Sequence, residues 1–138
     1  MSYLRLKVIT PKKVVLDEEV NSVTIPGADG ELTILPKHAN IFVLLKEGIV
    51  TIKQSGKEDF MAIGGGYLET DGKIITILVS RAYGQNEIDQ NMTEAALKSA
   101  KEILIKSKDK NERIEAESLL RRSIIDSKLL KKRRARSV

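Results

Sequence analysis

The chain of 138 residues has no cysteine and only one histidine, His38. The lack of cysteine excludes disulfides, thiolate nucleophiles and cysteine-ligated zinc or iron–sulfur sites. A single histidine likewise excludes a metal site built on two histidines of one chain. No apolar run approaches the roughly 20 residues that span a bilayer. The N-terminal segment alternates apolar and polar residues and is followed by Pro11, unlike a secretory signal peptide. We therefore expect a soluble protein of a reducing compartment.

Positive charge is concentrated towards the C-terminus. Residues 1–84 contribute nothing to the net charge of +5, since ten Lys and Arg balance ten Asp and Glu there, whereas residues 85–138 hold fourteen basic and nine acidic side chains. The last twelve residues carry six basic groups and no acidic one. Such a segment is compatible with binding to nucleic acid, to a membrane surface or to an acidic protein.

Glycine, proline and aromatic residues are missing from the second part of the chain. All nine glycines, three prolines and five aromatics lie at or before Gly84. Because glycine and proline mark turns, the 54 residues that follow without either favour helix. We therefore predict two domains, a β-domain over residues 1–84 and a helical domain over residues 85–138.

The first domain alternates apolar and polar residues with a period of two, as half-buried strands do. Turn residues separate the runs, and the Asp71-Gly72 pair is a strong hairpin signal. The pattern predicts an antiparallel β-sandwich or flattened barrel, since a parallel sheet would need helical crossovers for which no stretch is long enough. A turn is expected at Pro26-Gly27. The expected strands cover residues 3–9, 14–16, 20–25, 31–35, 41–45, 49–53, 59–63, 67–70 and 73–79.

The second domain has the spacing of two amphipathic helices, which predicts an antiparallel two-helix hairpin. Asn86, with Asp89 three residues later, is expected to cap the first helix, and Asp109, with Glu112, the second. Since two helices bury little surface, the hairpin is expected to be marginally stable and mobile. The expected apolar stripes are Ile88, Met92, Ala95, Ala96, Ser99, Ala100, Ile103 and Leu104 in the first helix, and Ala116, Leu119, Leu120, Ser123, Ile124 and Ser127 in the second.

Motifs that would support catalysis are weak. The triple glycine at residues 64–66 is followed by a strand pattern and lacks the Gly-Lys-Ser/Thr of a phosphate loop, so it predicts a tight turn or a close backbone approach. No Gly-x-Ser-x-Gly elbow supplies a nucleophile for His38. The neighbouring carboxylates at residues 18–19 and 58–59 point to opposite faces of a strand and do not converge on a substrate. We therefore expect no enzyme.

The basic C-terminal segment, KLLKKRRARSV, leaves three interpretations open. It is a solvated helix end, which the helix dipole favours, or it docks on an acidic protein surface, or it belongs to a small nucleic-acid-binding domain with a basic helical arm. The last alternative is weakened because no aromatic side chain follows Tyr83 to stack on a base.

The stretch over residues 27–50, GADGELTILPKHANIFVLLKEGIV, resembles the epsilon subunit of F-type ATP synthases, of bacterial or plastid type. That family has Gly-Glu-x-Gly-Ile/Val-Leu-Pro-x-His-Ala, then Leu-x-x-Gly and Gly-Gly-Phe/Leu-x-Glu. The chain departs from it at Thr33 and Lys37. It matches at Gly30, Glu31, Ile34, Leu35, Pro36, His38, Ala39, Leu45, Gly48, Gly65, Gly66, Glu69 and Ile88-Asp89.

The resemblance implies a β-sandwich followed by a helical hairpin, in a rotor subunit without catalysis of its own. The sandwich would bind the gamma subunit and the c-ring, and the helices would contact the alpha/beta catalytic head and oppose ATP hydrolysis. Such a protein is peripheral on the cytoplasmic face of a bacterial membrane, or the stromal face of a thylakoid, through the complex alone. The implied interface with ring and gamma is Glu31, Thr33, Leu35, Lys37, His38 and Ala39. The implied contacts with the head are Arg121, Arg122, Lys131, Lys132, Arg133 and Arg134.

Some members of this family bind ATP at the base of the hairpin, and here the equivalent positions would be Asp89 and Arg122. The chain departs from that motif, because Met92 and Thr93 replace Arg-Ala and Asp126 stands where a further arginine is expected. A lost arginine and a gained carboxylate disfavour an anion. We expect weak or absent ATP binding and no other cofactor.

Overall fold

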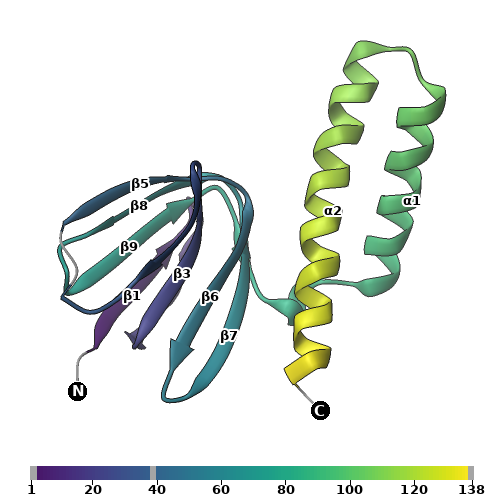
Figure 1. Cartoon of the computed structure of the whole chain (residues 1–138). Coiled ribbons are helices and arrows are strands. Elements are labelled where there is room, and N and C mark those ends of the chain that lie inside the picture. The colour runs from purple at the N-terminus through teal and green to yellow at the C-terminus, as the bar shows by residue number, and fades with distance from the viewer. Residues whose placement is uncertain (1–2, 38–39, 137–138) are drawn as a thin grey trace. The chain divides into compact units, whose positions relative to one another are not determined.

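The computed structural model describes residues 3–37 and 40–136, with side chains in the last helix described as far as Lys132. The chain divides into two compact units, Met1–Gly84 and Gln85–Val138. The first is built of strands and the second of helices (Figure 1). The fold class predicted from the sequence, a β-sandwich followed by a two-helix hairpin, is confirmed.

The first unit is one sheet curled into two layers. The order of its strands is β10-β7-β6-β3-β5-β8-β9-β1-β2, with β4 paired to β3. In Figure 1, β5, β8 and β9 form one side of the sandwich and β3, β6 and β7 the other. The strands are β1 Leu4–Ile9, β2 Val14–Val20, β3 Ser22–Gly27, β4 Gly30–Ile34, β5 Ile41–Leu45, β6 Gly48–Gln54, β7 Lys57–Ile63, β8 Gly66–Thr70, β9 Ile74–Val79 and β10 Ala82–Tyr83.

Alternate side chains of these strands meet between the two layers. In β1, Leu4, Leu6 and Val8 are fully buried while Arg5 and Lys7 lie on the outer face. Each fully buried aliphatic side chain of this kind stabilises the fold by about 1.5–3 kcal/mol. The core also contains Val20, Val23, Ile25, Ile34, Leu45, Val50, Ile52, Ile63, Leu68, Ile75, Ile77 and Val79.

Two details of the sheet differ from the prediction. All pairs are antiparallel except β1 with β9, which is parallel. No helical crossover is needed, because the connection between these two strands is the rest of the sandwich. Pro26 and Gly27 belong to β3, and the turn lies at residues 28–29. Gly30, which follows the turn and begins β4, has a φ of 134°.

The triple glycine lies where backbone and side chains approach closely, as predicted. A Cβ at Gly66 would meet the carbonyl oxygen of Leu78 and would lie 2.8 Å from Cα of Val79 on β9. A Cβ at Gly64 would lie 2.9 Å from Nη1 of Arg81. Close packing therefore requires glycine at positions 64 and 66, and no helix follows the triple glycine to form a phosphate-binding loop.

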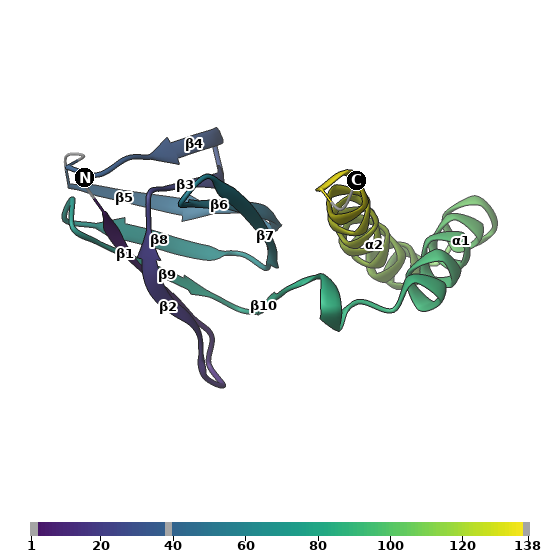
Figure 2. The ribbon, with the colours of Figure 1, turned by 90° about the horizontal axis from the view of Figure 1, so that it is seen from below.

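The second unit consists of a short 3₁₀ turn, η1 Gln85–Glu87, followed by α1 Gln90–Lys106 and α2 Lys110–Arg136, which lie side by side and antiparallel (Figures 1 and 2). The cap of α1 is Asp89, whose Oδ1 accepts a hydrogen bond from the Met92 amide at 3.0 Å. The prediction that Asn86 caps this helix is wrong, since Asn86 lies within η1. Asp109 precedes α2 as expected, and its Oδ1 accepts from the Asn111 amide at 3.2 Å.

Among the described residues of the two helices, four of the five buried side chains are small, and the fifth is Leu129 of α2. Thr93 and Ala100 of α1 and Ala116 and Ser123 of α2 are buried. The predicted stripes are partly wrong, because a helix that packs on one partner buries a narrower stripe than the apolar sequence pattern offers. The exposed members of those stripes are Met92, Ala95, Ser99, Leu119 and Ile124. Neither helix, over its described residues, has an apolar stretch long enough to cross a membrane.

Candidate interaction surface

The predicted contact residues before Pro36 share one face of β4. Glu31 and Thr33 lie in the strand and Leu35 follows it, and the three are exposed at alternating positions. Thr33 is fixed by a hydrogen bond between its hydroxyl and that of Thr24 on β3, with 2.8 Å between the oxygens. The strand predicted over residues 31–35 is therefore confirmed, as β4.

Lys37, the next predicted contact residue, follows the C-terminal end of β4. Lys37 adopts a left-handed backbone with φ of 63° and donates its amide hydrogen to the Gly72 carbonyl, 3.1 Å away. This ties the segment after β4 to the hairpin between β8 and β9. His38 and Ala39 lie outside the described residues, so their contacts stay predictions.

A second surface, which sequence reasoning missed, lies on the outer face of β5, β8, β9 and β1. Register places Leu44 opposite Tyr67, Tyr67 opposite Leu78, and Leu78 beside Ile9. Phe42 stacks on Tyr67 with 5.2 Å between ring centroids and 27° between planes. We call these five residues the apolar stripe. Phe42 is 62% and Leu44 61% exposed, and neighbouring exposed apolar side chains of this kind make the stripe a candidate interaction site.

One sequence signal could have revealed the stripe. The segment Ile41–Leu45 reads IFVLL and is apolar at every position. A strand with one face on the core and one in water needs apolar residues only at every second position. The extra pair, Phe42 and Leu44, therefore indicated a strand whose outer face also has a partner.

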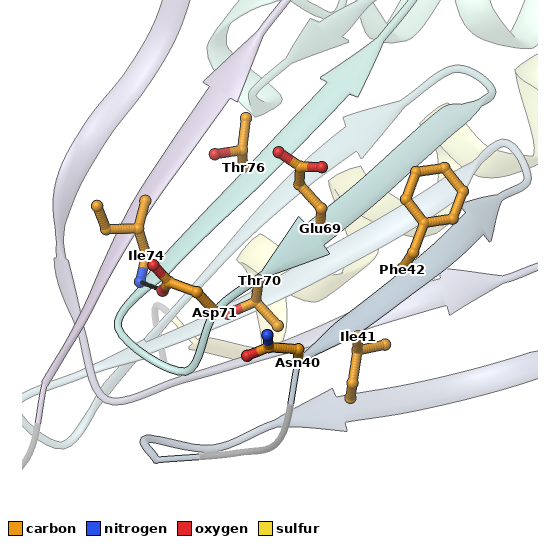
Figure 3. A pocket seen from close by; sticks show the side chains of 8 residues that line it. All are labelled: Asn40, Ile41, Phe42, Glu69, Thr70, Asp71, Ile74 and Thr76. Atoms are coloured by element: carbon orange, nitrogen blue, oxygen red, sulfur yellow. Dashed lines mark hydrogen bonds between the residues drawn. The ribbon is translucent and has the colours of Figure 1, made fainter.

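A hollow of about 560 Å³ adjoins the apolar stripe at the Phe42 end (Figure 3). Phe42, Glu69 and Thr76 point to the same side of the sheet, and register makes them neighbours on β5, β8 and β9. Asp71 also lines the hollow, but its Oδ1 accepts hydrogen bonds from the amides of Lys73 and Ile74, each at 2.9 Å. These bonds, first that from Ile74, lower the pKa of Asp71 below its ordinary value. The other lining residues are Asn40, Ile41, Thr70 and Ile74.

The predicted cations of the helical unit do not form a single face. Arg121, Arg122, Lys131 and Lys132 are exposed on α2. At about 100° per residue, positions 121 and 132 share one side of the helix, while positions 122 and 131 each lie on others. Arg133 and Arg134 belong to α2, and their side chains lie outside the described ones. The described cations are therefore spread over several sides of α2, whereas Leu129 of the same segment is buried.

The residues proposed for ATP have other structural roles or stay untested. Asp89 uses Oδ1 as the cap of α1, and Arg122 lies exposed on α2. No group of three histidine, aspartate or glutamate side chains within the described part of the chain is arranged to hold a metal ion.

Comparison with known proteins agrees with this architecture. The sequence model of the β-sandwich domain of the ATP synthase delta/epsilon chain matches residues 3–85. The ATP synthase epsilon chain of Geotalea uraniireducens is 41% identical over 123 residues, which are 88% of this chain and 89% of the relative. The chain belongs to the ATP synthase epsilon chain family. The epsilon chain of Geobacter sulfurreducens is 39% identical over 124 residues, with the same shares of each chain.

Solved structures share the fold. One chain of the Euglena gracilis mitochondrial ATP synthase, in an assembly of OSCP, F1 and c-ring, is similar with a TM-score of 0.77 and 24% identity, over 100% of this chain and 83% of that one. A chain of the central stalk and c-ring of the Tetrahymena thermophila enzyme is similar with a TM-score of 0.62 and 14% identity, over 92% and 96%. At these identities the likeness concerns the fold. The same fold is therefore built from widely different sequences.

Proposed function

We propose that the chain is a subunit of the central stalk of an ATP synthase, with no active site of its own, that couples rotation of the c-ring to the catalytic head. The observation that carries this proposal is the apolar stripe, Ile9, Phe42, Leu44, Tyr67 and Leu78, on the outer face of a sandwich of the epsilon chain family. A subunit that transmits torque needs an interface that does not dissociate, of about 1,200 Å² or more. The stripe supplies the apolar centre of such an interface, and its partner is the gamma subunit.

The exposed face of β4 is the proposed contact with the c-ring. Glu31, Thr33 and Leu35 present one carboxylate, one hydroxyl and one aliphatic side chain in a row. This row is on the layer that contains β3, whereas the apolar stripe is on the layer that contains β5. The sandwich therefore has separate proposed surfaces for the c-ring and for the gamma subunit.

The helical unit is the proposed regulatory element that opposes ATP hydrolysis. The small side chains between α1 and α2 bury little apolar area, so a few kcal/mol of differential binding is enough to favour another arrangement. The cations of α2 have the sign required to contact an acidic segment of the catalytic subunits. Family membership favours this partner over the nucleic acid considered above. The complex would hold the chain at the cytoplasmic face of a bacterial membrane or the stromal face of a thylakoid.

The stripe is tested with a double substitution, Phe42→Ser with Leu44→Ser, in the full chain. Both side chains are exposed, so the thermal midpoint should change little while co-purification with gamma is lost. The matched control is Ile105→Ser, which removes an exposed aliphatic side chain of α1, in the other unit. If the double variant still binds gamma like the control, the stripe is not the interface.

The regulatory role is tested by ending the chain after Gly84 and assembling it with the other subunits. The shortened chain should still assemble, and ATP hydrolysis by the complex should rise. Unchanged hydrolysis would contradict inhibition by the helices without affecting the proposed binding to gamma.

A further inference from the structure

Glu69 places a negative charge inside an apolar docking surface. Register sets it opposite Phe42 on β5 and opposite Thr76 on β9, and Tyr67 precedes it by two residues on the same face of β8. Its side chain is exposed and points to the side of the sheet on which Phe42 lies (Figure 3). Neighbouring side chains across strands are about 4.5–5.5 Å apart at Cβ, so the carboxylate borders the aromatic pair.

Glu69 has no hydrogen-bond or ion-pair partner within the described part of the chain. Two charged groups near it, those of Asp71 and Arg5, have partners elsewhere. Asp71, the other carboxylate of the hollow, accepts the amides of Lys73 and Ile74 in its turn. Arg5 on β1 pairs with Asp17 at 2.7 Å. Lys7 is in the same cross-strand row as Glu69, but Thr76 lies between them. The backbones of β1 and β8 are therefore about 9–10 Å apart at this row. Glu69 is thus the carboxylate that this face offers to a partner.

A partner that covers the apolar stripe removes water from Glu69. An ionised carboxylate buried without a counter-charge is strongly unfavourable, whereas one paired with a hydrogen-bonded cation is tolerated and fixes the register of the interface. The partner must therefore bring a cation to this point. The hollow beside Phe42 has room for a long side chain.

We infer that Glu69 is the charged anchor of the docking surface and pairs with an arginine side chain of the partner that enters the hollow beside Phe42. A guanidinium can donate two parallel hydrogen bonds to a carboxylate and stack on an aromatic ring, whereas an ammonium is a strongly hydrated point charge. Phe42, Glu69 and Thr76 supply the ring, the carboxylate and a further acceptor. This inference rests on the proposed function, in which the partner is gamma.

The test measures binding of the gamma subunit of the same ATP synthase to the full-length chain and to Glu69→Gln, which keeps the shape and removes the charge. Loss of one partner of such a pair should weaken binding about 30-fold and should flatten the dependence of the association rate on salt. The control is Glu58→Gln, an exposed carboxylate on β7, which should bind like the wild type. Thermal midpoints of all three chains should agree.

Charge exchange identifies the partner side chain. Glu69→Arg should abolish binding, and one arginine-to-glutamate substitution in gamma should restore it. If the unaltered chain does not bind gamma, the proposed function fails. If it binds and Glu69→Gln binds equally tightly with the same salt dependence, the anchor is refuted while the proposed function stands.

Discussion

Arg81 donates a hydrogen bond from Nη2 to Oε2 of Glu47, 2.9 Å away, and so ties the connection between β9 and β10 to the turn between β5 and β6. Both side chains are mostly buried, at 29% and 25% exposure. Burial lowers the pKa of Arg81, but hydrogen bonds with Glu47 and Tyr83 outweigh this and raise the pKa above its ordinary value. The guanidinium therefore stays charged, and its Nε is buried without a hydrogen-bond partner within the described residues.

Removal of Glu47 should leave this guanidinium inadequately paired. We expect Glu47→Ala to lower the free energy of unfolding by about 1–2 kcal/mol, more than an exposed ion pair contributes because solvent screens this one less. Urea unfolding followed by circular dichroism measures the change. Glu58→Ala, at an exposed position of β7, should change the free energy of unfolding by less than about 0.5 kcal/mol. Equal stability of the two variants would contradict a structural role for the pair.

The triple glycine offers a matched pair of substitutions. Gly66→Ala should destabilise the sandwich by about 1–3 kcal/mol or more, because the added Cβ meets backbone atoms of β9 that move only with the strand. Gly65→Ala should be tolerated, since its Cβ would lie 3.6 Å from the nearest neighbouring atom, the Leu45 carbonyl oxygen, at ordinary contact distance. Thermal melts of both variants separate the two outcomes, and a stable Gly66→Ala chain would refute the close approach.

The turn at Asp71 should make stability depend on acid pH. Its folded pKa lies below the ordinary value of 3.8, so the folded state binds this proton less readily than the unfolded state. The contribution of the Asp71 carboxylate to the stability of the folded state is fully present above pH 3.8 and is lost as the pH falls through the folded pKa. The free energy of unfolding of the wild type and of Asp71→Asn is measured from neutral to acid pH. The difference between the two free energies should shrink as the pH falls below 3.8. A difference that is constant over this range would show that the charge is irrelevant.

Arg113 of α2 should stabilise the helical hairpin at its turn. Its Nη1 donates to the carbonyl of Leu104 at 2.5 Å and to that of Ser107 at 3.2 Å, at the end of α1 where carbonyls lack helical partners. Arg113→Ala should lower the stability of the hairpin by about 1–2 kcal/mol. Hydrogen exchange of α1 amides reports this directly, with Lys101→Ala on the exposed side of α1 as the control. Faster exchange in the control than in Arg113→Ala would contradict the capping role.

Local chemistry in the sequence determined the elements of this protein. Alternating side chains define β1 and β9, the Asp71-Gly72 pair makes the hairpin between β8 and β9, and the absence of glycine and proline after Gly84 permits two long helices. These features act between residues close in sequence, so pattern alone is sufficient to find them.

Tertiary structure decided which surfaces exist. The parallel pairing of β1 with β9 joins residues about seventy positions apart, and it is this pairing that adds Ile9 to the stripe beside Leu78. The same register sets Glu69 between Phe42 and Thr76. Such neighbours depend on how the sheet curls and on the order of its strands, and no periodicity within one segment encodes them, because they come from the packing of the whole core.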